Sequence, residues 1–275
     1  MRVWINGRLL LDPNEPVLRV TDHGFTVGDG VFEAVKVVNG QPFALTRHLG
    51  RLTRSAKGLH LPAPDEAWVR EGVDEVLAEE HLALGRLRIT WTAGPAPLGS
   101  GRAHGGEPTL VVVAVPMTPY GPTAQVVTVP WPRNEHGAVA GLKTTSYAEN
   151  VVALAQAARH GASEAILPNT AGNICEGTGS NIFYVSQGEV RTPSLASGAL
   201  AGISRELLLE WMPDAVEIDE PIELLGEVEE AFLVSTTRDV QPIELIDGRV
   251  LAAPGPHTKR AMEIWAKNES RDTDP

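Results

Sequence analysis

The sequence predicts an α+β protein with mixed sheets, divided into two domains. Short apolar stretches of strand length alternate with segments of helical periodicity, without the regular strand–helix rhythm of a doubly wound parallel sheet. Near the middle, the proline-rich stretch VPMTPYGPTA can continue neither a helix nor a central strand. We therefore expect a small N-terminal α/β domain over residues 1–117, a linker over 118–122 and a larger C-terminal domain over 123–275.

The first half is expected to combine a sheet with two helices. Strands are predicted at residues 3–5, 31–38, 87–92 and 109–115, which are apolar and rich in β-branched residues. Asn39-Gly40 separates VKVV from QPFAL, which is a strong hairpin signal. Apolar residues recur at helical spacing over 45–59 and again over 66–83, so both segments are predicted to be amphipathic helices.

The second half contains more and shorter elements. Strands are predicted at residues 125–129, 164–167, 181–185, 189–191 and 230–235. Gln187-Gly188 is expected to turn two of them into a hairpin. Helices are predicted at residues 147–159, 204–211 and 256–267.

The composition excludes several classes of protein. A net charge of −12 disfavours nucleic-acid binding, because phosphate backbones require a basic surface. The single cysteine, Cys175, cannot form an internal disulfide, and the eight histidines lack metal-binding spacing, so no metal is expected. No apolar stretch approaches membrane-spanning length and the N-terminus lacks a signal-peptide core, so a cytoplasmic protein without membrane association is expected.

Lys143, in AGLKTTSYAEN, is the first candidate for chemistry. No charged residue lies within four positions on either side, and its neighbours are small, so a ligand could approach closely. A lysine in such surroundings has a lowered pKa and becomes a usable amine nucleophile. The same segment taken alone also fits an ordinary solvent-facing lysine.

Four further features have both a structural and a functional interpretation. Glu176 precedes the Gly-Thr-Gly-Ser turn in EGTGSNIF, and is either solvated or aimed into a pocket by that turn. Ser204 in GISR caps a helix whose free N–H groups could bind phosphate. Thr236 ends a strand and could donate to phosphate oxygens, and Arg51 is either a surface residue or a bidentate phosphate partner.

The order of these motifs resembles the class IV pyridoxal-phosphate aminotransferases, also called fold type IV. Along the chain come Arg51 after a His-Leu pair, GLKTTSY, EGTGSNIF, AGISRE and STTRDVQPI. The resemblance extends from INGRLL and TDHGFTVGDGVFEAVKV to the terminal helix. It implies a smaller N-terminal and a larger C-terminal domain with the cofactor, pyridoxal 5'-phosphate, between them, and generally a homodimer.

The resemblance also implies roles for individual residues. Lys143 would hold the cofactor as an internal Schiff base and shuttle the substrate proton. Glu176 would bind the pyridine nitrogen and keep it protonated, which makes the ring a better electron sink. The phosphate would be held by Arg51, the backbone N–H groups of Ile203 and Ser204, and Thr236. The usual G-I-T-R is G-I-S-R here, and serine keeps the hydroxyl.

Three branches of the family share this scaffold: D-amino-acid transaminases, branched-chain L-amino-acid transaminases and 4-amino-4-deoxychorismate lyase. The segment GDGVFEAVKVVNG looks most like the D-amino-acid transaminases, with Phe32 and Glu33 as the aromatic residue and the glutamate; Phe32 is expected to border the substrate. The lyases tend to carry a Thr pair after the aromatic residue. Ala34 stands at the position of the threonine thought to assist the lyases, which weakens that reading.

The substrate carboxylate clamp is a second guide to the branch. D-amino-acid enzymes use an Arg-x-His pair in a loop of the small domain, and Arg102-Ala103-His104 matches this string in the loop TAGPAPLGSGRAHGGE. Arg102 fits a carboxylate binder in the transaminase and in the lyase, whereas His104 favours the transaminase slightly. The alternatives are a flexible surface loop, or a clamp made by Arg88, Arg133 or Arg238.

The sequence therefore predicts a transaminase that moves the amino group of a D-amino acid, of the D-alanine type, to a 2-oxo acid. The alternative is 4-amino-4-deoxychorismate lyase, also as a second activity. A branched-chain L-amino-acid transaminase and a non-catalytic pyridoxal-phosphate-binding protein rank below these. The expected partners are small amino-acid and 2-oxo-acid substrates and a second copy of the chain.

Overall fold

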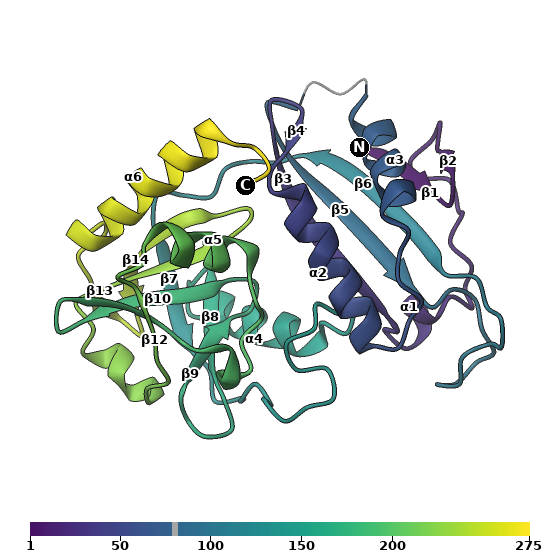
Figure 1. Ribbon diagram of the computed structural model, residues 1–275. Helices are drawn as coiled ribbons and strands as arrows, with labels where there is room; N and C mark the ends of the chain where they lie inside the picture. Colours follow the sequence, from purple (N-terminus) through teal and green to yellow (C-terminus); the bar gives the residue numbers. More distant parts are fainter. Residues whose placement is uncertain (79–81) are drawn as a thin grey trace. The chain divides into compact units, whose positions relative to one another are not determined.

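The computed structural model describes residues 1–78 and 82–275 and contains two compact units (Figure 1). The first unit comprises Met1–Pro119, Leu142–Ser146 and Thr273–Pro275. The second comprises Tyr120–Gly141 and Tyr147–Asp272. This grouping differs from the domains predicted from the sequence at two short segments, 142–146 and 273–275, which pack on the first unit although the chain around them belongs to the second.

A six-stranded antiparallel sheet forms the centre of the first unit. Its strand order is β2-β1-β6-β5-β3-β4. The strands are β1 (Arg2–Ile5), β2 (Arg8–Leu9), β3 (Gly30–Val38), β4 (Gln41–Pro42), β5 (Leu84–Thr92) and β6 (Thr109–Pro116). The predicted hairpin at Asn39-Gly40 is confirmed, because Val38 pairs with Gln41 and both turn residues have positive φ.

Two helices pack their apolar sides against this sheet. They are α2 (Leu45–Gly58) and α3 (Glu66–Leu77), while the short α1 (His23–Thr26) precedes β3. Leu49 and Leu52 of α2 and Val69 and Val73 of α3 share one buried core with Trp4 of β1. The predicted helix over 66–83 is shorter in the structure, and residues 79–81 of that prediction lie outside the described residues.

A nine-stranded mixed sheet forms the centre of the second unit. Its main path is β12-β11-β10-β13-β14-β7-β8-β9, and β15 pairs with β14. The strands are β7 (Ala124–Thr128), β8 (Glu164–Pro168), β9 (Ile174–Gly177), β10 (Asn181–Ser186), β11 (Glu189–Thr192), β12 (Val216–Glu217), β13 (Glu230–Ser235), β14 (Asp239–Ile246) and β15 (Arg249–Val250). Three strand pairs are parallel: β11 with β12, β14 with β7, and β7 with β8. Because a tight turn joins β9, at the end of the path, to β10, the sheet must curl.

Helices complete the second unit. They are α4 (Ala148–Arg159), α5 (Ile203–Trp211) and α6 (Pro256–Arg271), with 3₁₀ turns η1 (Leu195–Ser197) and η2 (Ile222–Gly226). Ala153 and Ala157 of α4 pack on Ala165 and Leu167 of β8. The α+β fold with mixed sheets that the sequence predicts is thus confirmed, and all three long helices of this half lie close to their predicted positions.

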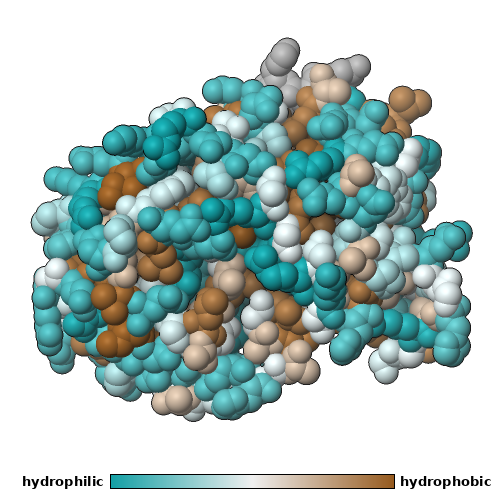
Figure 2. Space-filling view, in the orientation of Figure 1, coloured by the Kyte–Doolittle hydropathy of each residue, from teal (hydrophilic) through white to brown (hydrophobic). Residues whose placement is uncertain are grey.

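Figure 2 shows a largely hydrophilic face on which hydrophobic atoms form small separate patches. Within residues 1–78 and 82–275, no helix combines the length and the apolar character that crossing a membrane requires. The same residues contain no group of three or more His, Cys, Asp or Glu side chains suited to hold a metal ion.

The two faces of β3 have opposite characters. Successive side chains on a strand alternate between its faces. Val31, Val35 and Val37 therefore share one face, and all three belong to the core that α2 and α3 cover. Glu33 lies on this helix-covered face by the same alternation, whereas Phe32 points to the other face.

A buried ionic network joins Glu33 to α2. Arg51 donates from Nε to Glu33 Oε1 at 2.8 Å and from NH2 to Glu33 Oε2 at 2.7 Å. His48 Nδ1 lies 2.7 Å from Glu33 Oε2. Burial alone would raise the pKa of Glu33, but the charge and hydrogen bonds of Arg51, together with His48, lower this pKa to about 2.

We predict that Glu33→Gln strongly destabilises the fold. The substitution would leave the Arg51 guanidinium, whose side chain is 6% exposed, without its counter-charge. Removing one partner of a buried ion pair costs about 3–5 kcal/mol, which denaturant unfolding measures directly. Glu66→Gln, which removes an exposed i,i+4 partner of Arg70, is the matched control and should change stability by at most about 0.5 kcal/mol.

The lowered pKa of Glu33 also predicts how the stability difference between the wild type and Glu33→Gln depends on pH. The pKa of Glu33 is about 2 in the folded chain against an ordinary 4.5, so its carboxylate stabilises the fold above pH 4.5. This contribution is lost as the pH falls from 4.5 towards 2. The stability difference between the wild type and Glu33→Gln should therefore shrink over that interval, and a constant difference would contradict the assignment.

Candidate active site

The backbone of Lys143 extends the first sheet at the edge of β3. Phe32 N donates to Lys143 O at 3.1 Å, and Thr145 N donates to Gly30 O at 2.8 Å. These bonds make the segment 143–145 a short antiparallel addition to β3, with Lys143 opposite Phe32. Directly opposed residues project from the same face of a sheet, so the side chain of Lys143 lies beside the Phe32 ring.

Two glycines of the TVGDG segment permit this pairing. Gly28 has φ +70°, and a Cβ there would lie 2.5 Å from Ser146 Oγ. A Cβ on Gly30 would lie 3.2 Å from Thr145 Oγ1 and 3.0 Å from the Trp91 carbonyl oxygen. A side chain at Gly28 would be strained by the positive φ and would crowd Ser146, and a side chain at Gly30 would require its neighbours to shift, so glycine suits both positions.

The Lys143 amine and an arginine contact the same aromatic ring. Lys143 Nζ lies 4.5 Å from the Phe32 ring centroid, and Arg88 Cζ lies 3.9 Å from it. Arg88 is exposed and donates from Nε to Thr90 Oγ1 at 3.3 Å. The lysine backbone is fixed from the helix layer as well, since Lys143 N donates to Ser55 Oγ of α2 at 3.2 Å. An amine and a guanidinium on one ring suit a substrate that carries a carboxylate.

Arg51, predicted to bind phosphate, lies in the buried network with Glu33 and His48. Burial lowers the pKa of His48, Glu33 opposes this effect, and the charges of Arg51 and Lys143 add to it. The network is therefore within electrostatic reach of Lys143, on the same unit. Bidentate pairing fixes the plane of the Arg51 guanidinium, which is the pre-organisation that recognition of a phosphate requires.

Arg102, predicted to bind the substrate carboxylate, contacts groups of its own unit. Its Nε and NH2 donate to the two Asp29 oxygens at 2.7 and 2.6 Å. Its NH1 and NH2 also donate to the carbonyl oxygens of His60 at 3.0 Å and Leu59 at 2.7 Å. His104, two residues further on, is exposed. In this conformation Arg102 fastens the glycine-rich loop to the segment that follows α2.

Glu176 lies on β9 of the second unit and is mostly buried. Its Oε2 accepts the Leu200 N–H at 2.9 Å, and its Oε1 lies 3.2 Å from Arg133 Nε. Asn181, the asparagine of EGTGSN, donates from Nδ2 to the Leu200 carbonyl at 2.9 Å. The EGTGSN and AGIS motifs therefore meet at Leu200, which is bound through both its N–H and its carbonyl.

The start of α5 has the character of an anion site. Ile203 and Ser204 occupy its first turn, where N–H groups have no partner inside the helix and the dipole favours negative charge. Gly202 precedes them because a Cβ there would lie 2.0 Å from Asn181 Oδ1. Thr236 directly follows β13, whose Val234 pairs with Asn181.

The predicted site residues thus divide between the two units. Lys143, Phe32, Arg51, Arg102 and His104 belong to the first unit, and Glu176, Ile203, Ser204 and Thr236 belong to the second. The donor set fits pyridoxal phosphate group by group: an amine for its aldehyde, a carboxylate for its ring nitrogen, and helix N–H groups for its phosphate.

Sequence reasoning assigned no role to Glu33 or His48 and left Arg88 and Arg133 among several rival arginines. One signal was available for Glu33, because a charged residue interrupts the apolar run GVFEAVKVV at a helix-facing position. No comparable signal singles out Arg88 or Arg133, since their partners lie in other strands and helices.

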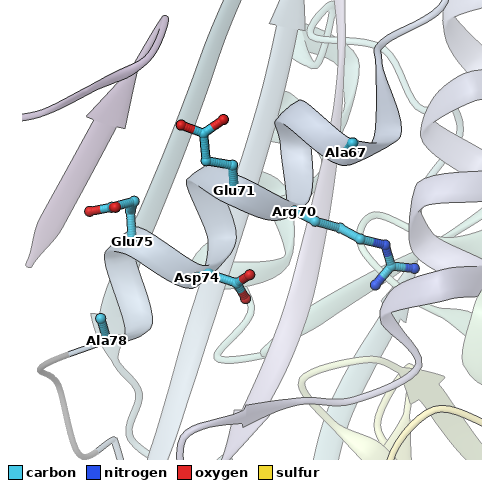
Figure 3. A pocket seen from close by; sticks show the side chains of 6 residues that line it. All are labelled: Ala67, Arg70, Glu71, Asp74, Glu75 and Ala78. Carbon is cyan, nitrogen blue, oxygen red and sulfur yellow. The ribbon is translucent and has the colours of Figure 1, made fainter.

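A surface hollow of about 530 Å³ lies along the outer side of α3 (Figure 3). Its lining residues all come from this helix and its end: Ala67, Arg70, Glu71, Asp74, Glu75 and Ala78. Three carboxylates against one guanidinium repel a phosphate, and none of the predicted site residues lines the hollow. It is therefore not a candidate for the cofactor site.

Comparisons with known proteins agree with these features. The family model "Amino-transferase class IV" matches residues 30–246. A Methanocaldococcus jannaschii protein, provisionally named a branched-chain-amino-acid aminotransferase, is 32% identical over 100% of this chain and 96% of its own. D-alanine aminotransferase of Bacillus licheniformis is 30% identical over 95% of both chains.

Among solved structures, the branched-chain aminotransferase from Thermoproteus uzoniensis, crystallised with norvaline, superimposes with a TM-score of 0.88 at 31% identity. The match covers 97% of this chain and 94% of that one. Family model, relatives and fold agree over nearly the whole sequence. The chain therefore belongs to the class IV aminotransferases, the pyridoxal-phosphate-dependent enzymes of fold type IV.

Proposed function

We propose that this enzyme transfers the amino group of a D-amino acid of the D-alanine type to a 2-oxo acid, with Lys143 as the covalent attachment point of its cofactor. The observation that carries the proposal is the position of Lys143. Its backbone is bonded to the β3 backbone and to the Ser55 hydroxyl of α2, and its amine contacts the same Phe32 ring as the Arg88 guanidinium. We also propose a homodimer, as the resemblance implies.

The chain's own groups perform distinct tasks in this proposal. The Lys143 amine would hold the cofactor through its aldehyde, and the same amine would accept the proton from the substrate α carbon. Pyridoxal phosphate, when bound, supplies the electron sink for that proton loss. Phe32 forms a wall beside the amine. Its ring face stabilises nearby positive charge and excludes water from one side of the reacting nitrogen.

The remaining predicted residues hold the cofactor. Glu176 would accept a hydrogen bond from the protonated ring nitrogen, and its negative charge would keep that nitrogen protonated, so that the ring withdraws electrons well. The N–H groups of Ile203 and Ser204, the Thr236 hydroxyl and Arg51 bind the phosphate. The fixed plane of the Arg51 guanidinium and the helix dipole support these roles.

The preference for a D-amino acid rests on two observations. The segment GDGVFEAVKVVNG resembles that of the D-amino-acid transaminases. The similarity to D-alanine aminotransferase extends over 95% of this chain. Ala34, which replaces the threonine of the lyases, counts against pyruvate elimination as the main activity.

A branched-chain L-amino-acid transaminase is the second candidate. It is favoured by the likeness to the M. jannaschii protein and to the T. uzoniensis structure. The exposed Arg88, which contacts the same aromatic ring as Lys143, would suit either enzyme, because both use substrates with an α-carboxylate.

We predict that D-alanine converts the cofactor to its amine form faster than L-leucine does. The holoenzyme is mixed with each amino acid in turn, and the change in the absorption band of the bound cofactor is followed. Faster conversion by L-leucine would reject the D-preference and support the second candidate. Release of pyruvate from aminodeoxychorismate, measured in parallel, would show the lyase activity.

We predict that borohydride reduction labels Lys143 alone, and that Lys143→Ala lowers turnover by at least about 10³-fold, because both the covalent link and the proton carrier are lost. Peptide mapping of the reduced protein identifies the labelled lysine. Lys57→Ala, an exposed lysine on α2, is the control and should keep turnover and labelling. A label on any other lysine would overturn the assignment.

We predict that Arg88→Gln raises the KM for amino acid or 2-oxo acid by about 10–100-fold, as expected for losing a hydrogen bond between charged groups. Arg102 reaches a substrate carboxylate only by leaving Asp29 and two carbonyl groups, so Arg102→Gln should have the smaller effect. Steady-state kinetics of the two variants, with unfolding curves as a stability control, separates the two arginines. A larger KM increase in Arg102→Gln would restore Arg102 and His104 as the clamp.

A further inference from the structure

Arg133 is held beside Glu176 by the second sheet. Arg133 N donates to Pro168 O at 2.7 Å, and Arg133 forms a parallel bridge with Asn169, so its backbone runs along the end of β8. On the other edge of β8, Leu167 pairs with Glu176 of β9. Arg133 and Glu176 thus flank the same strand: Glu176 belongs to the ladder between β8 and β9, and Arg133 is held by a backbone hydrogen bond at the end of β8.

The side chains of this pair meet in a mostly buried place. Arg133 Nε lies 3.2 Å from Glu176 Oε1, and the two side chains are 18% and 11% exposed. Among the residues that the structure describes, the Nε–H has no acceptor in hydrogen-bonding direction, so charge attraction holds this contact. On the opposite side, Arg133 NH1 donates to Asn150 Oδ1 at 3.2 Å, while Glu149, 81% exposed, lies 3.8 Å from the same nitrogen.

Asn150 connects this pair to the turn that follows Glu176. Its amide donates to the Thr178 carbonyl, and its oxygen accepts from Arg133. Buried Glu164 fixes this turn, because it accepts hydrogen bonds from Thr178 N at 3.0 Å and from Ser180 Oγ at 3.0 Å. The strand, the turn and the arginine thus all contact Glu176 or the residues beside it.

A substrate carboxylate is a poor alternative partner for Arg133. A substrate carboxylate bound there would lie beside the Glu176 carboxylate, whose side chain is 11% exposed, and two anions at one mostly buried site repel each other. The contacts of Arg133 therefore favour a role directed at Glu176.

We propose that Arg133 is a positioning residue that holds Glu176 ionised and correctly turned towards the cofactor's ring nitrogen. This inference rests on the role of Glu176 in the proposed function. Leu200 N–H occupies one carboxylate oxygen and the Arg133 charge faces the other. An ionised carboxylate has about four lone-pair sites, so it still accepts a bond from a ring N–H. A protonated Glu176 would instead donate its hydrogen, and the ring nitrogen would lose its counter-charge.

The test is a double-mutant cycle on the full-length chain with Arg133→Gln, Glu176→Gln and the double variant. Without added cofactor, Arg133→Gln should lower the melting temperature by about 2–4 °C, because it removes the positive charge that faces Glu176 Oε1. In the Glu176→Gln background the same change should have little effect, because position 176 then carries no negative charge for Arg133 to attract. Arg159→Gln, an exposed arginine at the end of α4, is the matched control.

The second readout is the cofactor itself. In the holoenzyme, Arg133→Gln should shift the pH titration of the cofactor's absorption band in the same direction as Glu176→Gln and weaken cofactor binding about tenfold. Arg133→Lys, which keeps the charge, should restore part of both effects. A merely structural arginine would lower the melting temperature without moving the absorption titration, and that result would overturn the inference.

The outcomes separate this inference from the proposed function. If Glu176→Gln leaves the cofactor's titration unchanged, the proposed role of Glu176 is wrong and so is this inference. Labelling of Lys143 still tests the attachment of the cofactor independently. If Glu176→Gln moves the titration and Arg133→Gln does not, the inference alone is overturned. Equal destabilisation by Arg133→Gln in both backgrounds would also overturn it.

Discussion

The short antiparallel pairing of β3 with the segment 143–145 is the constraint on which the candidate active site depends. The lysine is far from β3 in the sequence, and most of the chain around it belongs to the second unit. Two backbone hydrogen bonds, from Phe32 and Thr145, bring it to the edge of the first sheet. Gly28 and Gly30 favour this pairing, since a Cβ at either position would crowd a side chain of the incoming segment. The backbone of Lys143 is thus placed by main-chain pairing with β3 and by its bond to the Ser55 hydroxyl of α2.

Because side chains alternate between the faces of β3, the residues that stabilise the fold and the candidate site residues lie on opposite faces of this strand. On the face covered by α2, Glu33 binds Arg51 and His48 in a buried network that ties the helix to the strand. On the other face, the Phe32 ring contacts the Lys143 amine and the Arg88 guanidinium. One residue of register shift would exchange the two faces, placing a carboxylate beside the amine and an aromatic ring in the ion pair. The hairpin at Asn39-Gly40, which fixes this register, therefore contributes to the site although it lies at the far end of the strand.

Local signals in the sequence predicted most of the fold, and they failed where tertiary contacts override them. The helix predicted over 45–59 is found almost unchanged because periodicity and core burial agree there. Strand β14 was not predicted because Pro242 interrupts its apolar run, and a proline argues against a central strand. The structure accommodates that proline opposite Phe232, next to an irregular register with β7 between Ile243 and Leu245. The site was predicted through motif order, which identifies residue types at set positions. Motif order could not reveal the ion pairs of Arg51 and Arg102, which are made with residues distant in the sequence.

The distribution of counter-charges is what distinguishes the arginines from one another. In a chain with net charge −12, carboxylates are abundant, and Arg51, Arg102 and Arg133 each contact one: Glu33, Asp29 and Glu176. A substrate anion recruited to Arg102 or Arg133 would lie beside the carboxylate that the arginine already contacts. Arg88 lies over the Phe32 ring, a contact that persists when a carboxylate approaches from the side. The buried pair of Arg51 with Glu33 and the mostly buried pair of Arg133 with Glu176 orient their partners within the protein. The exposed Arg88 guanidinium, on the same ring as the Lys143 amine, suits an exchangeable anionic ligand.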